Sequence, residues 1–293
     1  MATKTAMITI AGRPNVGKST LTNYLVGEKI TIVSNKPQTT RNRICGIVTR
    51  DNLQFVFVDT PGYHRARTKL GDYMVSAVRE SIADVDATIL VVEPIASIGA
   101  QEEALLEQLR GSRVILAINK IDTVEKDKLL EVIDVYARTG AFDAIIPISA
   151  KTGDGVEELL RECEKYAVDS PFLFPEDVTT DQPEKQVMAE IIREKLLWCL
   201  EKEIPHGTAV EITRFTERDN GIIDLDATIY CEKASHKGII IGKQGAMLKK
   251  ISSLARQDCE RFMGTKVYLT TWVKVKENWR DSDFLVRNFG YRE

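Results

Sequence analysis

A glycine-rich loop near the N-terminus carries residue types that bind phosphate. The stretch GRPNVGKS, residues 12–19, fits the spacing GxxxxGK[ST] and follows the apolar run MITIA. In a loop between a strand and a helix, backbone N–H groups turn toward phosphate oxygens, and the helix N-terminus favours their negative charge. The alternative is a loop that only resembles such a site. The predicted phosphate-binding residues are Gly12, Arg13, Pro14, Asn15, Val16, Gly17, Lys18, Ser19 and Thr20.

A lysine, a serine and an aspartate are expected to bind the terminal phosphates and a magnesium ion. Lys18 should reach the β- and γ-phosphates as a catalytic residue, and the Ser19 hydroxyl should bind Mg²⁺. The motif DTPG, residues 59–62, follows the apolar run FVFV. Asp59 can hold the Mg²⁺ shell there, and the Gly62 N–H can contact the γ-phosphate.

The polar segment ITIVSNKPQTTRNR, residues 30–43, is predicted to be a switch. We expect one of its threonines to bind Mg²⁺ only when the γ-phosphate is present, so that the segment orders and disorders with the nucleotide. Thr40 is the predicted metal ligand and catalytic residue, and Thr39 is the alternative. Arg41 and Arg43 either stabilise charge on the transferred phosphoryl group or, as we rather expect, face solvent or a partner.

Two further motifs predict that the base is guanine. NKID, residues 119–122, ends the apolar run VILAI. The Asp122 carboxylate would accept from the N1–H and amino group of guanine, whereas adenine offers neither donor on that edge. Asn119 would support the base, and the stem of Lys120 would cover it. The NKID motif therefore disfavours an ATP kinase. SAK adds a backbone contact to the base through Ser149, Ala150 and Lys151.

One catalytic group is missing from its expected place. Ras-like enzymes use a glutamine after the aspartate-to-glycine motif to orient the attacking water. Tyr63 occupies that position, and its side chain is a poor substitute. His64 is a candidate base, although an exposed loop histidine is the simpler interpretation. The sequence therefore predicts slow intrinsic hydrolysis that a partner or an ion accelerates.

A second glycine loop, GIIIGKQGAMLKK at residues 238–250, lacks GK[ST] and contains GKQG between apolar segments. A GxxG loop lets the backbone of single-stranded RNA approach closely, because glycine has no side chain in the way. Residues 233–257 hold six basic and no acidic residues, which favours such a polyanion. The alternative is an ordinary helix-turn-helix corner. The predicted RNA-binding residues are Lys237, Ile240, Ile241, Gly242, Lys243, Gln244, Gly245, Lys249 and Lys250, with the isoleucines as an apolar groove floor.

The elements that must position these motifs fall into two groups. Residues 1–170 alternate β-branched apolar runs with amphipathic helical runs, which predicts an α/β domain with a mostly parallel sheet and one antiparallel edge hairpin at Asp51–Asn52. Residues 171–185 contain three prolines and no hydrophobic period, which predicts a linker between the two domains. Residues 186–293 predict a smaller α+β domain with a long helix, two strands, the GxxG helices and a final strand.

Composition restricts the class of protein. The 293 residues are 43% hydrophobic and 28% charged, as in globular proteins. The five cysteines are scattered without a CxxC pair, which argues against disulfides and zinc sites and suits a reducing cytoplasm. No stretch suggests a signal peptide or a bilayer span.

The first half resembles bacterial translation-factor-related GTPases that replace the catalytic glutamine by a bulky residue. Several of these place an asparagine where Asn15 stands and use it to hold K⁺, so Asn15 is a candidate K⁺ ligand or, alternatively, a brace for the loop. The order of the second half resembles a type II KH RNA-binding domain. The whole chain, including PEDVTTDQP at 175–183 and AEIIREK at 189–195, resembles the Era family of ribosome-associated GTPases.

The resemblance implies several properties that spacing and charge do not. They are binding of the 3′ end of small-subunit ribosomal RNA, a role in maturing the small ribosomal subunit, and peripheral association with the inner membrane. We also expect a monomer in the cytoplasm that does not bind DNA. The main hypothesis is a GTP-dependent switch that controls RNA binding. The alternative is an RNA-binding assembly factor in which the nucleotide is mainly structural.

Overall fold

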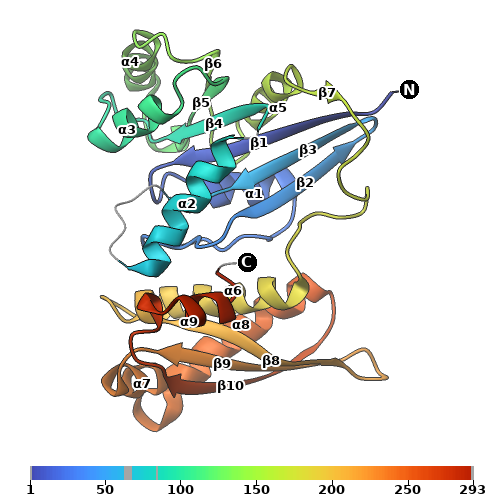
Figure 1. Cartoon of the computed structure of the whole chain (residues 1–293), viewed down its shortest axis with the longest axis vertical. Helices are drawn as coiled ribbons and strands as arrows, with labels where there is room; N and C mark the ends of the chain where they lie inside the picture. The colour runs from blue at the N-terminus through green and yellow to red at the C-terminus, as the bar shows by residue number, and fades with distance from the viewer. Residues whose placement is uncertain (1, 63–67, 84, 292–293) are drawn as a thin grey trace. The chain divides into compact units, whose positions relative to one another are not determined.

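The computed structural model describes residues 2–62, 68–83 and 85–291, which form two compact units (Figure 1). Unit 1 contains the described residues of 2–31, 40–62 and 74–181. Unit 2 contains residues 32–39, 68–73 and 182–291. Two short segments of the N-terminal half are therefore grouped with the C-terminal half.

Unit 1 is built on a seven-stranded sheet with the order β2-β3-β1-β4-β5-β6, and β7 pairs with β1. The pairs from β3 to β6 are parallel, whereas β2 pairs antiparallel with β3 at the edge. The strands are β1 Lys4–Gly12, β2 Ile44–Arg50, β3 Leu53–Asp59, β4 Ala87–Val92, β5 Val114–Ile118, β6 Ala144–Pro147 and β7 Val168–Asp169. The predicted α/β class and edge hairpin are confirmed.

Helices cover both faces of this sheet, because its central strands are apolar on both sides. Side chains of α1 and α5 pack with β1, β3, β4 and β5 in one core, and those of α3 and α4 pack with β4 and β5 in another. The helices are α1 Lys18–Val26, α2 Lys69–Ala83, α3 Ala100–Gln108, α4 Lys126–Ala137 and α5 Val156–Glu164. The phosphate loop, Asp59 and Asn119 follow β1, β3 and β5, so they meet at the carboxyl edge where such sheets bind ligands.

Unit 2 has a three-stranded sheet with the order β10-β9-β8, in which β8 and β9 are antiparallel and β9 and β10 parallel. Side chains of α6, α7 and α8 bury one face of it. The elements are α6 Glu184–Cys199, β8 Ala209–Glu217, β9 Ile223–Cys231, α7 Ala234–Ile241, α8 Ala246–Met263, β10 Val267–Val275 and α9 Asp283–Asn288. The predicted order of elements is confirmed, with the GxxG loop between α7 and α8.

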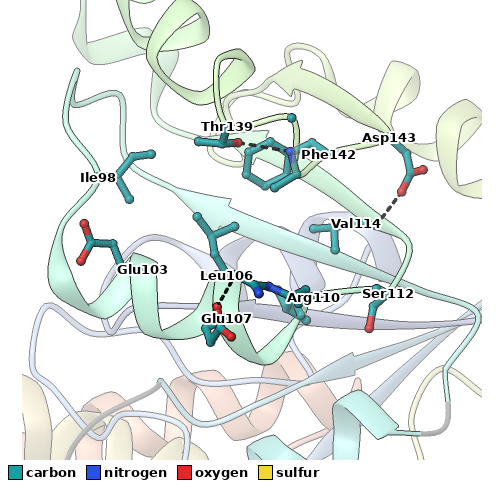
Figure 2. A pocket seen from close by; sticks show the side chains of 14 residues that line it. Ile98, Glu103, Leu106, Glu107, Arg110, Ser112, Val114, Thr139, Phe142 and Asp143 are labelled. Atoms are coloured by element: carbon teal, nitrogen blue, oxygen red, sulfur yellow. Dashed lines mark hydrogen bonds and ion pairs between the residues drawn. The ribbon is translucent and has the colours of Figure 1, made fainter.

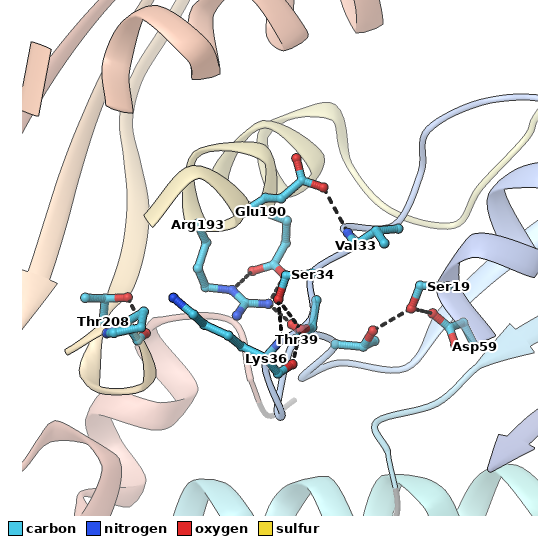
Figure 3. A network of polar contacts seen from close by, with 12 residues as sticks. Ser19, Val33, Ser34, Lys36, Thr39, Asp59, Glu190, Arg193 and Thr208 are labelled. Carbon is cyan, nitrogen blue, oxygen red and sulfur yellow. Dashed lines mark hydrogen bonds and ion pairs between the residues drawn. The ribbon is translucent and has the colours of Figure 1, made fainter. Parts of the chain in front are cut away.

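Helix α6 carries charged side chains that are almost fully buried in unit 2. Glu190 is 9% exposed, Lys195 is 1% exposed, and Arg193 and Glu194 are fully buried. Arg193 Nε donates to Glu190 Oε1 at 2.8 Å (Figure 3), and Lys195 Nζ lies 2.6 Å from Glu194 Oε2. Buried charges are costly unless paired, so these pairs impose one arrangement on the helix rather than add stability.

Segment 32–39 packs against α6 within unit 2 through its backbone. The Val33 N–H donates to Glu194 Oε1 at 2.9 Å, and Trp198 Nε1 donates to the Val33 carbonyl at 2.9 Å. Arg193 donates to the Thr39 carbonyl. Because these contacts involve backbone atoms of segment 32–39, they form only when the segment has this backbone conformation.

Among the helices of the described residues, none combines the length and the apolar composition needed to cross a bilayer.

Candidate functional site

The phosphate loop joins β1 to α1 and contains two glycines that the fold requires. Gly12 has φ +151°, and a Cβ there would lie 2.5 Å from the Val91 carbonyl oxygen. Gly17 has φ +103°, and its Cβ would lie 2.2 Å from Nδ2 of Asn119. Glycine adopts these positive φ angles without strain, and it has no Cβ to collide with the neighbouring atoms. The loop therefore packs directly on the motif predicted to recognise the base.

The predicted catalytic lysine is buried inside this loop. Lys18 is 6% exposed, and its Nζ donates to the carbonyl oxygens of Gly12 at 3.1 Å and Arg13 at 2.9 Å. Burial lowers the pKa of Lys18 to about 8, although Asp59 opposes the shift. The ammonium group is thus held inside the loop. When a nucleotide binds, phosphate oxygens would replace these carbonyl oxygens as its hydrogen-bond acceptors.

The structure brings the three predicted metal ligands together, and Figure 3 labels two of them, Ser19 and Asp59. Ser19 Oγ donates to Asp59 Oδ2 at 2.8 Å and lies 2.9 Å from Thr40 Oγ1. Asp59 is fully buried, and burial raises its pKa to about 6 against the lowering effect of Lys18. Oxygens from three separate segments are therefore gathered at one point, as a hard cation requires.

Thr39 and Thr40 have different surroundings, which separates the two candidates for the metal ligand. The Thr39 hydroxyl donates to the Lys36 carbonyl at 2.6 Å and lies 2.8 Å from Ser34 Oγ, within unit 2. The Thr40 hydroxyl instead lies beside Ser19 in unit 1. In the described chain only the second arrangement places a threonine oxygen with the other predicted ligands.

The expectation that Arg41 faces solvent is wrong. Arg41 is 1% exposed, whereas Arg43 is exposed as expected. The preceding residue, Thr40, is also buried at 6% exposure.

The residues around the predicted water site are only partly described. A Cβ on Gly62 would lie 2.9 Å from the Cα of Pro14, so this glycine allows the DTPG motif to touch the phosphate loop. Tyr63 and His64 lie outside the described residues. Their predicted roles therefore stay predictions.

The base-recognition motifs form one hydrogen-bonded group. Asn119 Nδ2 donates to the Val16 carbonyl at 2.8 Å, and its Oδ1 accepts from the Ala150 N–H at 2.9 Å. Ser149 Oγ donates to Asp122 Oδ1 at 2.8 Å. These bonds connect the phosphate loop, NKID and SAK, and they fix the Asp122 carboxylate while the residue itself remains exposed. Thr20 is half-buried in α1, and Lys151 is exposed.

Two glutamates that the sequence did not indicate also contact this group. Glu93 follows β4 and accepts from Lys120 Nζ at 2.5 Å and from Arg13 at 3.3 Å. Glu102, 4% exposed, forms an ion pair with Arg13. An acidic residue at the carboxyl end of a buried strand was the available signal for Glu93, since ligand sites collect at that edge.

A pocket of about 660 Å³ lies elsewhere on unit 1, between α3 and the turn that precedes β6 (Figure 2). Its lining includes Ile98, Leu106 and Phe142 together with the polar side chains of Glu107 and Arg110. None of the residues predicted to bind nucleotide lines it. We therefore place the chemistry at the phosphate loop, where polar groups converge, and not at this pocket.

The second glycine loop adopts backbone angles that suit close approach of a ligand. Gly242 and Gly245 have φ +73° and +78°, and Gln244 has φ +52°. A Cβ on Gly242 would lie 2.7 Å from the Cβ of Met247. The side chains of Lys243 and Gln244 are exposed, and Lys249 and Lys250 are exposed on α8. Lys237 is half-buried.

The expectation that Ile240 forms a groove floor is corrected by its burial. Ile240 is fully buried in the core with Ile192, Ile229 and Ile251, whereas Ile239 is 49% exposed. Three consecutive isoleucines on a helix point about 100° apart, so only some of them can face the core. Ile239, and the half-buried Ile241, are the apolar side chains that a ligand can reach.

Binding of magnesium nucleotide is expected to peak between about pH 6 and pH 8. Below about pH 6 the Asp59 carboxyl becomes neutral and loses its attraction for Mg²⁺, and above about pH 8 Lys18 loses its charge. Each pH unit beyond these limits should weaken binding about tenfold. Fluorescence titrations of a GDP analogue from pH 5 to pH 9 measure this, and the acidic loss should disappear when EDTA replaces Mg²⁺. An affinity independent of pH would contradict the assignment.

Two family models match the chain. One described as "50S ribosome-binding GTPase" matches residues 7–120, and one described as "KH domain" matches residues 203–280. GTPase Era of Ruminiclostridium cellulolyticum is 51% identical over 294 residues, which cover 100% of this chain and 99% of the relative. GTPase Era of Clostridium kluyveri is 50% identical over 291 residues, which cover 99% of each.

Two solved structures are similar along the whole chain. A variant of Aquifex aeolicus Era bound to GDP and AlF4⁻ has 35% identity and a TM-score of 0.94. An Era in complex with MgGDPNP and nucleotides 1506–1542 of 16S ribosomal RNA has 36% identity and a TM-score of 0.94. Each match covers 99% of this chain and 100% of the other.

Proposed function

Because the chain belongs to the Era family of GTPases, we propose that its GTP site is the group of residues around the phosphate loop. The observation that carries the proposal is the meeting of Ser19, Thr40 and Asp59 beside Lys18. Asp122, fixed by Ser149, accepts from guanine, and Lys18 neutralises charge on the transferred phosphoryl group. The division into residues 1–170, 171–185 and 186–293 belongs to the same proposal.

The residues present fit a magnesium ion. Oδ1 of Asp59 is buried and has no hydrogen-bond partner among the described residues, so it is oriented for a ligand that the chain itself does not supply. Mg²⁺ takes oxygen ligands and is typically shared with nucleotide phosphates. Ser19, Thr40 and Asp59 would hold it, and the ion would neutralise charge on the phosphate oxygens.

Hydrolysis is proposed to be slow until K⁺ or a partner accelerates it, because Tyr63 replaces the water-orienting glutamine. Asn15 has φ 66°, so Asn15→Gly removes its side chain while keeping the backbone conformation. We expect single-turnover hydrolysis to be about tenfold faster in K⁺ than in Na⁺ for the wild type and equal in both salts for the variant. Rapid hydrolysis in sodium-only buffer without a partner would contradict the proposal.

Unit 2 is proposed to bind the 3′ end of small-subunit ribosomal RNA through the GxxG loop and to act in maturing the small ribosomal subunit. The exposed Lys243 and Gln244 and the left-handed glycines support this. A similar Era was solved with a 16S ribosomal RNA fragment. We also propose that the protein is a monomer, and that it is located in the cytoplasm and associates peripherally with the inner membrane.

Nucleotide control of RNA binding is proposed to act through segment 32–40. Thr40 lies with the metal ligands, and the carbonyl oxygen of the adjacent Thr39 accepts a hydrogen bond from Arg193 of α6. When Thr40 binds the metal, the peptide that joins the two threonines must follow. The backbone bonds between the segment and α6 would therefore respond to the nucleotide.

A titration of single-stranded RNA at fixed salt tests this control. With a GTP analogue, GDP or no nucleotide, the switch hypothesis expects affinities that differ by about tenfold or more. Lys18→Ala should abolish that difference. If the folded variant bound RNA as the wild type does in every state, the alternative of an assembly factor with a structural nucleotide would be favoured.

A further inference from the structure

Four charged side chains from four different elements form one ion network in unit 1. Arg13 belongs to the phosphate loop, Glu93 follows β4, Glu102 lies in the first turn of α3, and Lys120 belongs to NKID. Arg13 is 80 residues from Glu93 and still further from the other two, so the fold brings the phosphate loop to the other three side chains. The network touches both ends of the proposed nucleotide site.

Glu93 is the centre of the network. Its Oε2 accepts from Arg13 Nη2 at 3.3 Å, and its Oε1 accepts from Lys120 Nζ at 2.5 Å. Lys120 Nζ also donates to the Asn15 carbonyl of the phosphate loop at 2.8 Å. Each carboxylate oxygen of Glu93 therefore holds a different nucleotide-binding motif.

The remaining member fixes the position of the network. The Glu102 side chain is only 5% exposed and forms an ion pair with Arg13, whereas the side chains of Arg13, Glu93 and Lys120 are 29%, 30% and 37% exposed. A buried carboxylate must keep a charged partner, so Arg13 cannot swing into solvent without leaving Glu102 unpaired. Arg13 in turn holds the carboxylate of Glu93 at a defined place.

We propose that Glu93 is a positioning residue that ties the phosphate loop to the guanine-recognition motif and thereby sets how long the nucleotide stays bound. The proposal rests on the guanine-nucleotide site proposed above. Through Lys120, Glu93 orients the aliphatic stem that covers the base, and through Arg13 it holds the start of the phosphate loop. Base and phosphate contacts are therefore lost together and not one at a time.

Electrostatic repulsion alone predicts the opposite effect of removing this charge. Glu93 is a negative group beside a site for a polyanion, so neutralising it would remove a repulsion and strengthen binding. Loss of positioning would weaken binding, because Lys120 would keep only its bond to the Asn15 carbonyl. The direction of the change therefore distinguishes the two explanations.

The test measures release of a fluorescent GDP analogue from the full chain in Mg²⁺. Glu93→Gln keeps the size of the side chain and is expected to accelerate release about tenfold. The rate constant for hydrolysis of bound GTP should change much less, which separates positioning from chemistry. Arg13→Gln should act in the same direction, and the double variant should add less than the sum, because both changes remove one bridge.

Glu103→Gln is the matched control, because this exposed glutamate beside Glu102 in the first turn of α3 undergoes the same loss of charge, and its release rate should equal that of the wild type. Glu93→Asp keeps the charge on a shorter stem and should give an intermediate rate, which keeps the test valid if the glutamine variant does not fold. Unchanged or slower release in both Glu93 variants, or additive effects with Arg13→Gln, would overturn the proposal. Failure of the wild type to bind GDP would instead contradict the nucleotide site itself.

Discussion

Asp122→Asn is expected to lower the affinity for GTP by about 10⁴-fold and to create affinity for xanthosine triphosphate. The carboxylate accepts two hydrogen bonds from guanine, whereas an amide presents one donor that faces the amino group of the base. Xanthine carries a carbonyl oxygen in place of that amino group, and the new amide can donate to it. Ser149 Oγ, 2.8 Å from Asp122 Oδ1, can keep its bond to the amide oxygen, so the side chain stays in place.

Equilibrium titrations with fluorescent GTP and xanthosine triphosphate analogues measure this exchange. Asp127→Asn is the matched control, because Asp127 is an exposed aspartate in the first turn of the nearby helix α4 and makes the same change of charge. It should bind GTP as the wild type does. If Asp122→Asn kept its preference for GTP, another group would select the base, and the assignment of NKID would be wrong.

The parts of the fold that could be predicted are those in which local sequence and tertiary structure agree. The run ATILVV is apolar at every position except Thr88, and it forms β4, which is buried along its length. The loop GRPNVGKS has its conformation set by glycines at 12 and 17 and by the helix that follows. Loops that follow neighbouring parallel strands lie at the same edge of the sheet. The sequence alone therefore predicts that Ser19 and Asp59 lie close together.

The remainder depends on contacts between residues far apart in sequence. Nothing local distinguishes Ile240 from Ile239, because the helical phase that buries one of them is set by the core of unit 2. Glu102 looks like any acidic residue in a first helical turn until Arg13 lies beside it. The buried Arg193 of α6 is similar, since charged residues are expected at the surface of a helix unless a partner is known.

The double variant Lys243→Asp/Gln244→Asp is expected to weaken RNA binding about 100-fold while GTP hydrolysis without RNA is retained. Both side chains are exposed at the loop between α7 and α8, and two new carboxylates would repel RNA phosphates where a lysine attracted them. The fold should survive, because Gln244 has φ +52° and aspartate tolerates that conformation better than most residues. RNA titrations at several salt concentrations measure both the affinity and its salt dependence.

The control must make the same chemical changes away from the loop. Gln101→Asp/Lys128→Asp does so at exposed positions on α3 and α4 of unit 1, and it should bind RNA as the wild type does. Removing a phosphate contact should also reduce the slope of log affinity against log salt by about 0.7, because fewer counterions are released. A loop variant with unchanged affinity and slope would show that the GxxG corner is a structural turn, and the RNA site would have to be sought on another surface. A loss shared with the control would attribute the effect to net charge instead of to the loop.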